Sequence, residues 1–204
     1  MRDQTSLEEL FNSITHGIGA ILSVIAGSTL LYKASVLNDF YKIVGFGIYG
    51  ICLVILYISS TLFHGIKPSR TKNIFQTMDH NSIYLLIAGS YTPFCLVTLK
   101  GTWGWFLLIT LWSITFIGLI LKLTIGLRSC AIYLIMGWIA IIAIKPLICN
   151  LSLNGFLFLL AGGLAYSLGV IFYVQEKKPY FHTIWHFFVM GGSFFHFLTV
   201  LYYV

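Results

Sequence analysis

Long apolar stretches, separated by a few charged residues, make up almost the whole of this 204-residue chain. A helix needs about 20 apolar residues to cross the hydrocarbon core of a bilayer. The stretches without Asp, Glu, Lys or Arg are residues 10–32, 43–66, 80–99, 101–121, 129–144, 146–175 and 179–204. This pattern predicts seven membrane-spanning helices, at residues 17–36, 41–64, 77–99, 103–123, 128–148, 153–174 and 182–203.

Two prolines fall within these spans. Pro93 lies inside the third span and is expected to kink it, because proline lacks the N–H that a helix interior requires. The fifth charge-free stretch is short. We expect the Lys145 ammonium to reach the membrane surface and Pro146 to lie at the helix end, so that the fifth span is long enough.

Composition supports the same fold class. Only 9% of the residues are charged and 58% are hydrophobic, with a mean hydropathy of +0.91. A soluble domain carries about 25% charged residues, so this chain has too few charges to cover a surface in water. The sequence predicts an all-α membrane protein with one seven-transmembrane domain over residues 1–204. Its basic residues do not cluster with aromatic ones, so no nucleic-acid partner is expected.

The distribution of Lys and Arg predicts the orientation. The N-terminus and the loops after spans two, four and six carry eight basic residues: Arg2, Lys67, Arg70, Lys72, Lys122, Arg128, Lys177 and Lys178. The opposite side carries four, which are Lys33, Lys42, Lys100 and Lys145. Basic residues are enriched in cytoplasmic loops. We therefore expect a cytoplasmic N-terminus and an extracytoplasmic C-terminus.

Polar side chains gather at the predicted cytoplasmic end of the bundle. His64 ends the second span, Asp79 lies at the start of the third, and His182 and His186 open the seventh. The spacing of His182 and His186 places both rings on one helix face. Ser60 lies one turn before His64 and shares its face. Polar groups inside a membrane are costly and usually functional.

Three imidazoles with an open position are typical of a catalytic zinc site. Neutral imidazole suits zinc and brings no buried charge. Asp79 would offset part of the charge of the ion and could hydrogen-bond to water on it. A haem held by two histidines is an alternative, but the i, i+4 pair and the nearby carboxylate favour a small ion.

The remaining polar residues allow more than one interpretation. Glu9, Asn12 and His16 are spaced i, i+3 and i+7 on one face of the entry helix. They could cap and anchor the first span, or they could contact the side chains of the metal ligands without binding the metal themselves. His80 follows Asp79 and points about 100° away from it, so an interhelical hydrogen bond is the expected role.

His196 lies ten residues beyond His186, which is about 15 Å further along the helix. We expect it to be a buried, hydrogen-bonded residue that does not reach the metal site. A proton or ion transporter would need polar groups at this depth, and in the sequence only His196 qualifies.

Four motifs carry a family resemblance. They are ELFNSITHGIG at 9–19, STLFH at 60–64, MDHNSIYLLIAGSYTP at 78–93 and HTIWH at 182–186. With them the chain resembles the bacterial hemolysin III branch of the progestin and adipoQ receptor family. The resemblance implies seven spans, a cytoplasmic N-terminus and a Zn²⁺ ion held by His64, His182 and His186. It also implies that the nearby Asp and Ser of the family fall on Asp79 and Ser60.

The resemblance implies a function as well. It suggests a multi-pass protein of the cell (inner) membrane, in which zinc activates water, Asp79 and Ser60 assist, and a lipid amide is hydrolysed, as in membrane ceramidase-like proteins. Only about ten residues precede the first apolar stretch, which favours the bacterial branch over the hormone receptors. Two alternatives are a non-catalytic sensor of membrane homeostasis with structural zinc, and a pore-forming cytolysin. The pore is disfavoured because most polar residues stop at one membrane face.

Overall fold

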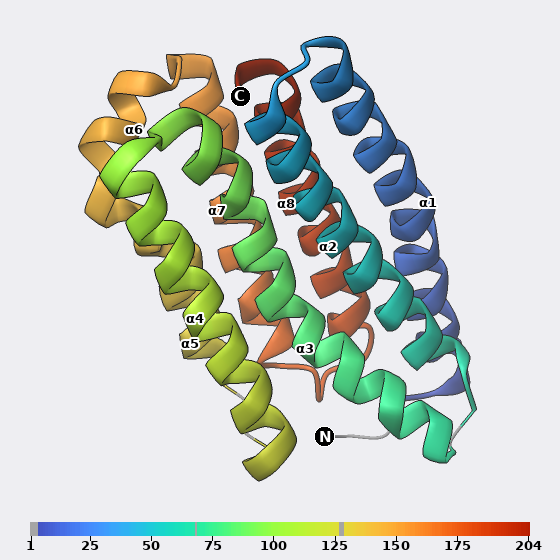
Figure 1. Ribbon diagram of the computed structural model, residues 1–204. Coiled ribbons are helices and arrows are strands. Elements are labelled where there is room, and N and C mark those ends of the chain that lie inside the picture. The colour runs from blue at the N-terminus through green and yellow to red at the C-terminus, as the bar shows by residue number, and fades with distance from the viewer. Residues whose placement is uncertain (1–3, 68, 127–128) are drawn as a thin grey trace.

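The protein is a bundle of helices whose long axes run in roughly the same direction (Figure 1). The computed structural model describes residues 4–67, 69–126 and 129–204, and no strand occurs among them. Within this described part, seven helical segments are long and apolar enough to cross a membrane: Ser6–Val36, Phe40–Gly65, Arg70–Leu99, Gly101–Ile125, Cys130–Asn150, Leu153–Tyr173 and Phe181–Tyr203. The all-α fold with seven spans is therefore confirmed.

The orientation in the membrane stays a prediction, since the helices themselves do not distinguish the two sides. Two of the twelve basic residues behind it, Arg2 and Arg128, lie outside the described residues.

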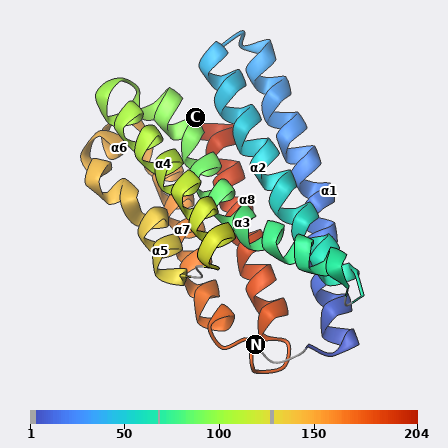
Figure 2. The same ribbon diagram turned by 60° about the horizontal axis from the view of Figure 1, so that its bottom comes forward.

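Two groups of helices pack closely. Helix α1 (Ser6–Val36) runs along α2 (Phe40–Gly65), and α2 runs along α3 (Arg70–Pro93). Helix α7 (Leu153–Tyr173) pairs with α8 (Phe181–Tyr203), and α8 also packs against α1 (Figure 2). This arrangement brings the start of α8 to the same end of the bundle as the start of α1 and the end of α2.

Helices α1 and α3 begin earlier than the hydrophobic pattern predicts. Helix α1 starts at Ser6 instead of residue 17, because a capping box closes its first turn. In that box Thr5 Oγ1 accepts from Glu8 N at 3.3 Å, and Glu8 Oε2 accepts from Thr5 N at 2.9 Å. Helix α3 starts at Arg70 instead of residue 77, after Ser69, whose hydroxyl caps the helix. The added turns are polar, so hydropathy alone does not detect them.

The fifth span is not one continuous helix, contrary to the prediction. It consists of α5 (Cys130–Trp138), a 3-10 segment η2 (Ile139–Ala143) and α6 (Ile144–Asn150). Pro146 lies in the first turn of α6, which is the N-terminal end of that short helix and not the end of the whole span. Proline tolerates the first turn because the N–H it lacks has no intrahelical partner there. The break therefore precedes the proline.

The chain also changes helix type at Pro93. Helix α3 ends at this proline, and the span continues as the π-helix η1 (Phe94–Leu99) before α4 (Gly101–Ile125) begins. A wider turn is one way to accommodate a backbone carbonyl that has lost its N–H partner. The structure thus shows a change of helix type at Pro93, where the sequence predicts a kink.

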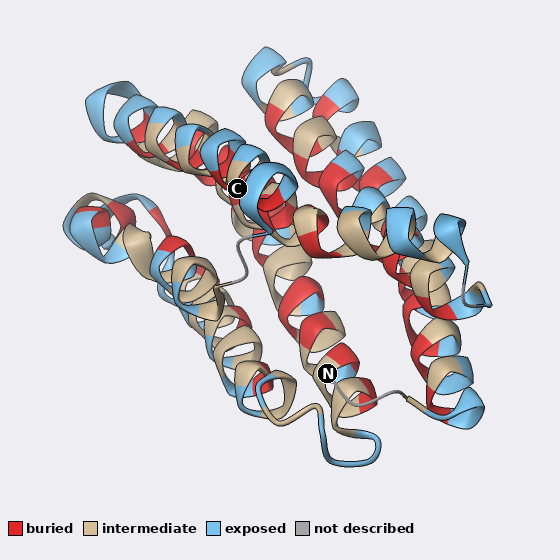
Figure 3. Ribbon diagram, turned by 90° about the horizontal axis from the view of Figure 1, so that it is seen from below, coloured by how far each residue is buried: buried red, intermediate tan, exposed pale blue. Residues whose placement is uncertain are grey.

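Buried residues face the centre of the bundle, and exposed residues face outward (Figure 3). Tyr49, Phe46 and Tyr84 are among the largest fully buried side chains. Many exposed side chains are large and apolar, as expected for contact with lipid. Glycines allow helices α1 and α2 to approach closely, since a Cβ on Gly50 would lie 2.9 Å from the Gly27 backbone.

Candidate metal centre

Three histidines from two helices converge at one end of the bundle. His64 lies in the last turn of α2, and His182 and His186 lie in the first two turns of α8. One ring nitrogen of each lies within 4.8 Å of the others. The ring centroids are 4.8–5.1 Å apart, so the three side chains surround one point. His64 and His186 are buried and His182 is partly buried.

A carboxylate on α1 orients His64. The Nδ1 atom of His64 lies 2.6 Å from Glu9 Oε2. The second oxygen of Glu9 binds Lys72 Nζ at 2.8 Å, which holds the carboxylate in place. A carboxylate at Nδ1 selects the tautomer with hydrogen on Nδ1 and leaves the lone pair on Nε2. That Nε2 is buried and has no hydrogen-bond partner among the described residues.

His186 is oriented in the same way by a hydroxyl group. Its Nδ1 lies 3.1 Å from Thr15 Oγ1. The Thr15 hydroxyl is also within 3.0 Å of the Phe11 and Asn12 carbonyls and donates its hydrogen to them. It therefore accepts from His186 Nδ1–H, and the lone pair of His186 remains on Nε2. Two of the three histidines thus offer Nε2 as a metal ligand.

The imidazole of His16 packs against the ring of His186. The two rings stack with centroids 3.5 Å apart and planes inclined by 12°. His16 is buried, and neither of its nitrogens has a hydrogen-bond partner among the described residues. It does not belong to the three-histidine group. Its contact is with the face of a ligand ring, which restricts the orientation of that ring.

Helix α1 also holds the start of α8. Thr183 Oγ1 donates to Asn12 Oδ1 at 2.5 Å, and Tyr180 N donates to Glu8 Oε1 at 2.9 Å. Tyr180 has a φ of +60°, so the chain turns sharply just before α8 begins. His182 is less tightly held, because its Nδ1 is 3.9 Å from Glu176 Oε2, beyond hydrogen-bond distance.

These contacts bear on the two interpretations left open for the polar face of α1. Glu9 contacts His64, His16 contacts His186, and Asn12 contacts the residue after His182. All three support residues of the histidine cluster, and the same contacts anchor α1. Sequence reasoning missed Glu8, Thr15 and Thr183. The first two could have been found, because residues 8, 12 and 15 also share a helix face.

Asp79 and Ser60 lie beside the cluster. The Ser60 hydroxyl and the His64 ring are polar groups that face the Asp79 carboxylate. Ser60 Oγ is buried, yet it forms no hydrogen bond of ordinary geometry with any described residue. Asp79 is not part of the group with metal-ligand spacing. The structure thus places a carboxylate and a neighbouring hydroxyl beside the three histidines, outside their ring of ligand atoms.

His80 and His196 are not among the three grouped ligand side chains. The His80 backbone carbonyl accepts from Tyr133 OH at 3.3 Å and links α3 to α5. This interhelical hydrogen bond involves the backbone, so the expected role of the imidazole stays a prediction. The sequence predicts that His196 is hydrogen-bonded. Its ring nitrogens form no hydrogen bond of ordinary geometry with the described residues, and the backbone carbonyl of Leu159 lies near the ring.

Other polar groups besides His196 lie along α8 beyond the three-histidine cluster. The Ser193 hydroxyl binds Tyr57 OH at 2.8 Å and Tyr166 OH at 2.9 Å. These groups satisfy one another, so they form a buried cross-link between α2, α7 and α8. Hydropathy gave no signal for them, because tyrosine and serine are common in apolar helices.

The residues present fit a zinc ion. Imidazole nitrogen is a preferred zinc ligand, with bonds of about 2.0–2.1 Å. Ligand atoms within 4.8 Å of one another can reach one ion with small side-chain movements. The hydrogen bond from His64 to Glu9 is the arrangement that zinc-binding histidines usually show.

Comparison with known proteins identifies the family. The family model described as "Haemolysin-III related" matches residues 4–197, which include every residue of the cluster. The chain belongs to the haemolysin-III related family.

Relatives of this family are similar over nearly the whole chain. Hemolysin-3 of Bacillus cereus is 49% identical over 201 residues, which cover 97% of this chain and 92% of that protein. The Hemolysin-3 homolog of Bacillus subtilis (strain 168) is 47% identical, covering 98% and 95%. The human Monocyte to macrophage differentiation factor is 31% identical, covering 96% and 84%. The resemblance to the hemolysin III branch is confirmed.

Proposed function

We propose that this hemolysin III family protein is a zinc-dependent hydrolase that cleaves an amide-bonded lipid within the membrane. The observation that carries the proposal is the His64 side chain. Its Nδ1 is held by Glu9, and its buried Nε2 has no other partner among the described residues. An unpaired buried nitrogen is costly unless a ligand uses it.

His64, His182 and His186 would hold the ion. When bound, zinc supplies Lewis acidity, which polarises a carbonyl group and makes water more acidic. Structural zinc sites have four protein ligands, whereas catalytic sites have three and keep one position open. The cluster has three histidines, and Asp79 is not among their ligand atoms. The ligand count therefore supports a catalytic site.

Asp79 and Ser60 have complementary roles in the proposal. The Asp79 carboxylate accepts a proton from the attacking water and passes it to the leaving amine, as a general base and then a general acid. The Ser60 hydroxyl, which faces the Asp79 carboxylate, donates a hydrogen bond to the substrate carbonyl oxygen as negative charge develops on it. Glu9 keeps His64 in the required tautomer throughout.

The surroundings support a lipid substrate. The cluster lies in a bundle whose outer surface is largely apolar, so a substrate that enters between helices comes from the bilayer. The amide bond is suggested by the resemblance to ceramidase-like membrane proteins. The predicted cytoplasmic position of the cluster and the location in the cell (inner) membrane belong to the same proposal.

The test is hydrolysis of N-acyl lipids by the purified protein in lipid nanodiscs, with zinc, with a chelator and after zinc is restored. Asp79→Asn should keep the zinc and lower turnover by about 10²–10⁴-fold, the usual contribution of a general base. Asp39→Asn is the matched control, because Asp39 caps the N-terminus of α2 and His64 lies at the other end of this helix. The Asp39→Asn variant should keep full activity. No turnover by fully zinc-loaded parent protein would contradict the proposal.

The second candidate is a non-catalytic sensor in which zinc links α2 to α8. It is favoured by the hydrogen bonds from α1 to both helices, which join Glu9 to His64 and Thr15 to His186. In a sensor, Asp79 would complete a closed site. Asp79→Asn would then release zinc and lower the melting temperature, and the parent would show no turnover.

A further inference from the structure

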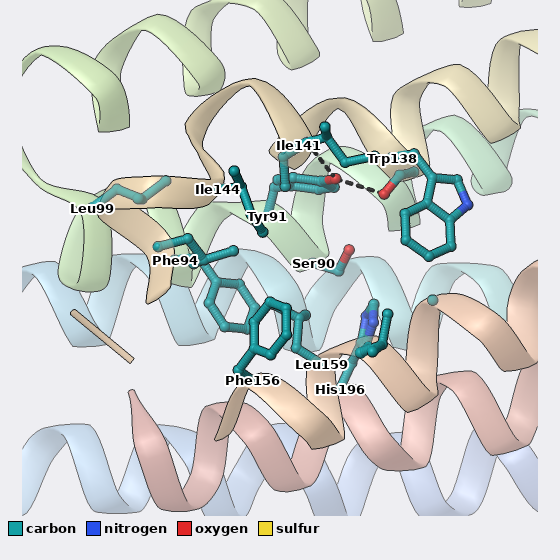
Figure 4. Close-up of a pocket in the computed structure, with 15 residues that line it drawn as sticks. Ser90, Tyr91, Phe94, Leu99, Trp138, Ile141, Ile144, Phe156, Leu159 and His196 are labelled. Carbon is teal, nitrogen blue, oxygen red and sulfur yellow. Dashed lines mark hydrogen bonds between the residues drawn. The ribbon is translucent and has the colours of Figure 1, made fainter. Parts of the chain in front are cut away.

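The side chain of His196 lines a cavity between α3, α5, α7 and α8. The cavity has two adjoining parts of about 100 Å³ each. Residues that line both parts are Ser90, Tyr91, Gly137, Trp138, Gly163 and His196. Figure 4 shows one of the two parts, with Ser90, Tyr91, Trp138 and His196 labelled. No charged side chain is among the described residues that line it.

The cavity is elongated along the bundle. One part is lined by Tyr173 and Trp185, and the ring of Tyr173 lies 6.1 Å from that of His182 in the cluster. The other part extends to Leu147 and Phe156, towards the opposite end of the helices. Aliphatic and aromatic side chains form most of its wall. Its shape and lining suit a hydrocarbon chain whose one end lies near the three histidines.

His196 stands out among the polar groups of this cavity. The Tyr91 hydroxyl donates to the Gly137 carbonyl at 2.6 Å, and the Ser90 hydroxyl donates to the Ile87 carbonyl at 2.9 Å. Neither ring nitrogen of His196 has a hydrogen-bond partner among the described residues.

The ring of His196 is held firmly in this position. A Cβ on Gly162 would collide with it, so the glycine allows the imidazole to lie directly against α7. On another side the Tyr166 ring makes an edge contact, with centroids 5.4 Å apart. The imidazole therefore cannot turn freely to find a protein partner.

A neutral imidazole has one N–H donor and one nitrogen that accepts. The Leu159 carbonyl lies near the ring and could take the N–H after a small movement. The accepting nitrogen still needs a donor, and no described residue supplies one. A carboxylate, ester or ketone would not help, because these groups only accept.

We propose that the cavity binds the acyl chain of a lipid and that His196 accepts a hydrogen bond from a hydroxyl group on that chain. The inference rests on the proposed function in one respect, namely that the carbonyl end of the chain lies at the three histidines. His196 is about 15 Å along α8 from His186, so the hydroxyl should lie roughly 12 carbons from the carbonyl. His196 would then select the substrate.

The test compares two neutral probes of equal chain length, N-stearoylethanolamine and N-(12-hydroxystearoyl)ethanolamine. Each is used to displace a fluorescent N-acyl amide from the purified protein in nanodiscs. The parent should bind the hydroxylated probe about fivefold to tenfold more tightly, as expected for one buried hydrogen bond. His196→Leu should bind both probes equally. If that variant is unstable, His196→Phe should show the same loss of preference.

Two glycine variants test the location. Gly163 lines the cavity and has room for a side chain beside Trp138, so Gly163→Leu should fill the space and weaken both probes. Gly191 does not line the cavity and has open space around it, so Gly191→Leu is the control with unchanged binding. Equal affinity of the parent for both probes, or full binding by Gly163→Leu, would overturn the inference.

Failure of this inference is distinguishable from failure of the proposed function. His64→Ala removes a proposed zinc ligand but leaves the cavity lining intact. It should abolish hydrolysis and keep the preference for the hydroxylated probe. A parent protein that prefers this probe but never hydrolyses any amide would retain the binding site and refute only the enzyme.

Discussion

Glu9 provides the sharpest test of the metal centre, because it touches a proposed ligand without being one. Its Oε2 lies 2.6 Å from His64 Nδ1, and its Oε1 lies 2.8 Å from Lys72 Nζ. Glu9→Ala removes both contacts, so the His64 ring can rotate or adopt the other tautomer. Glu9→Gln keeps an oxygen that can accept from Nδ1–H and removes the negative charge.

The size of the effect follows from these contacts. Removing the partner of a metal-binding histidine costs about 10–100-fold in metal affinity. We expect a loss near the upper end for Glu9→Ala and about tenfold, or 1.4 kcal/mol, for Glu9→Gln. Lys72→Met should change zinc affinity less than tenfold, because an ion pair near the surface contributes about 0–1 kcal/mol.

The assay is competition for zinc between the purified protein and a chromophoric chelator in detergent. Glu176→Gln is the matched control, since Glu176 is 3.9 Å from His182 Nδ1 and makes no hydrogen bond with it. That variant should keep the affinity of the parent. The reasoning would be refuted if Glu9→Ala bound zinc as tightly as the parent, or if Glu176→Gln lost as much as Glu9→Ala.

Three further predictions concern metal content, topology and packing. Elemental analysis should find about one zinc per chain. Most of this zinc should be lost when His64, His182 or His186 is replaced by alanine, and it should be kept in His80→Ala. Equal zinc content in all four variants would exclude the three-histidine site. A reporter fused to the C-terminus should read as extracytoplasmic and one in the loop at 67–72 as cytoplasmic, and the reverse pattern would overturn the charge argument. Gly50→Ala should lower the melting temperature, because its Cβ would lie 2.9 Å from the Gly27 backbone, whereas Gly191→Ala should not; equal melting temperatures would refute the close α1–α2 contact.

Hydropathy predicted the number of spans because burial in lipid is a property of each segment. Hydropathy did not predict where helices begin or break, because these features depend on capping hydrogen bonds and on the backbone. The first turns of α1 and α3 are polar and are stabilised by caps at Thr5 and Ser69. The fifth span is apolar apart from Lys145 and Asn150, and residues 139–143, where the helix breaks, are all apolar. The break therefore changes the backbone and leaves the hydropathy unchanged.

The histidine cluster was predictable to the extent that its members obey local rules. The i, i+4 spacing of His182 and His186 puts them on one helix face whatever the rest of the chain does. That His64 lies at the same depth follows from its place at the end of a span. The motifs around these residues identified the family.

The sequence by itself thus determined the fold class, the number of spans, the family and the end of the bundle at which the histidines lie. The tertiary structure decided which side chains meet: Glu9 with His64, His16 with His186, and His196 with an apolar cavity. Depth in a membrane follows from position along a helix. Contact also depends on how each helix is rotated and how closely its neighbours approach, and packing across several helices sets both.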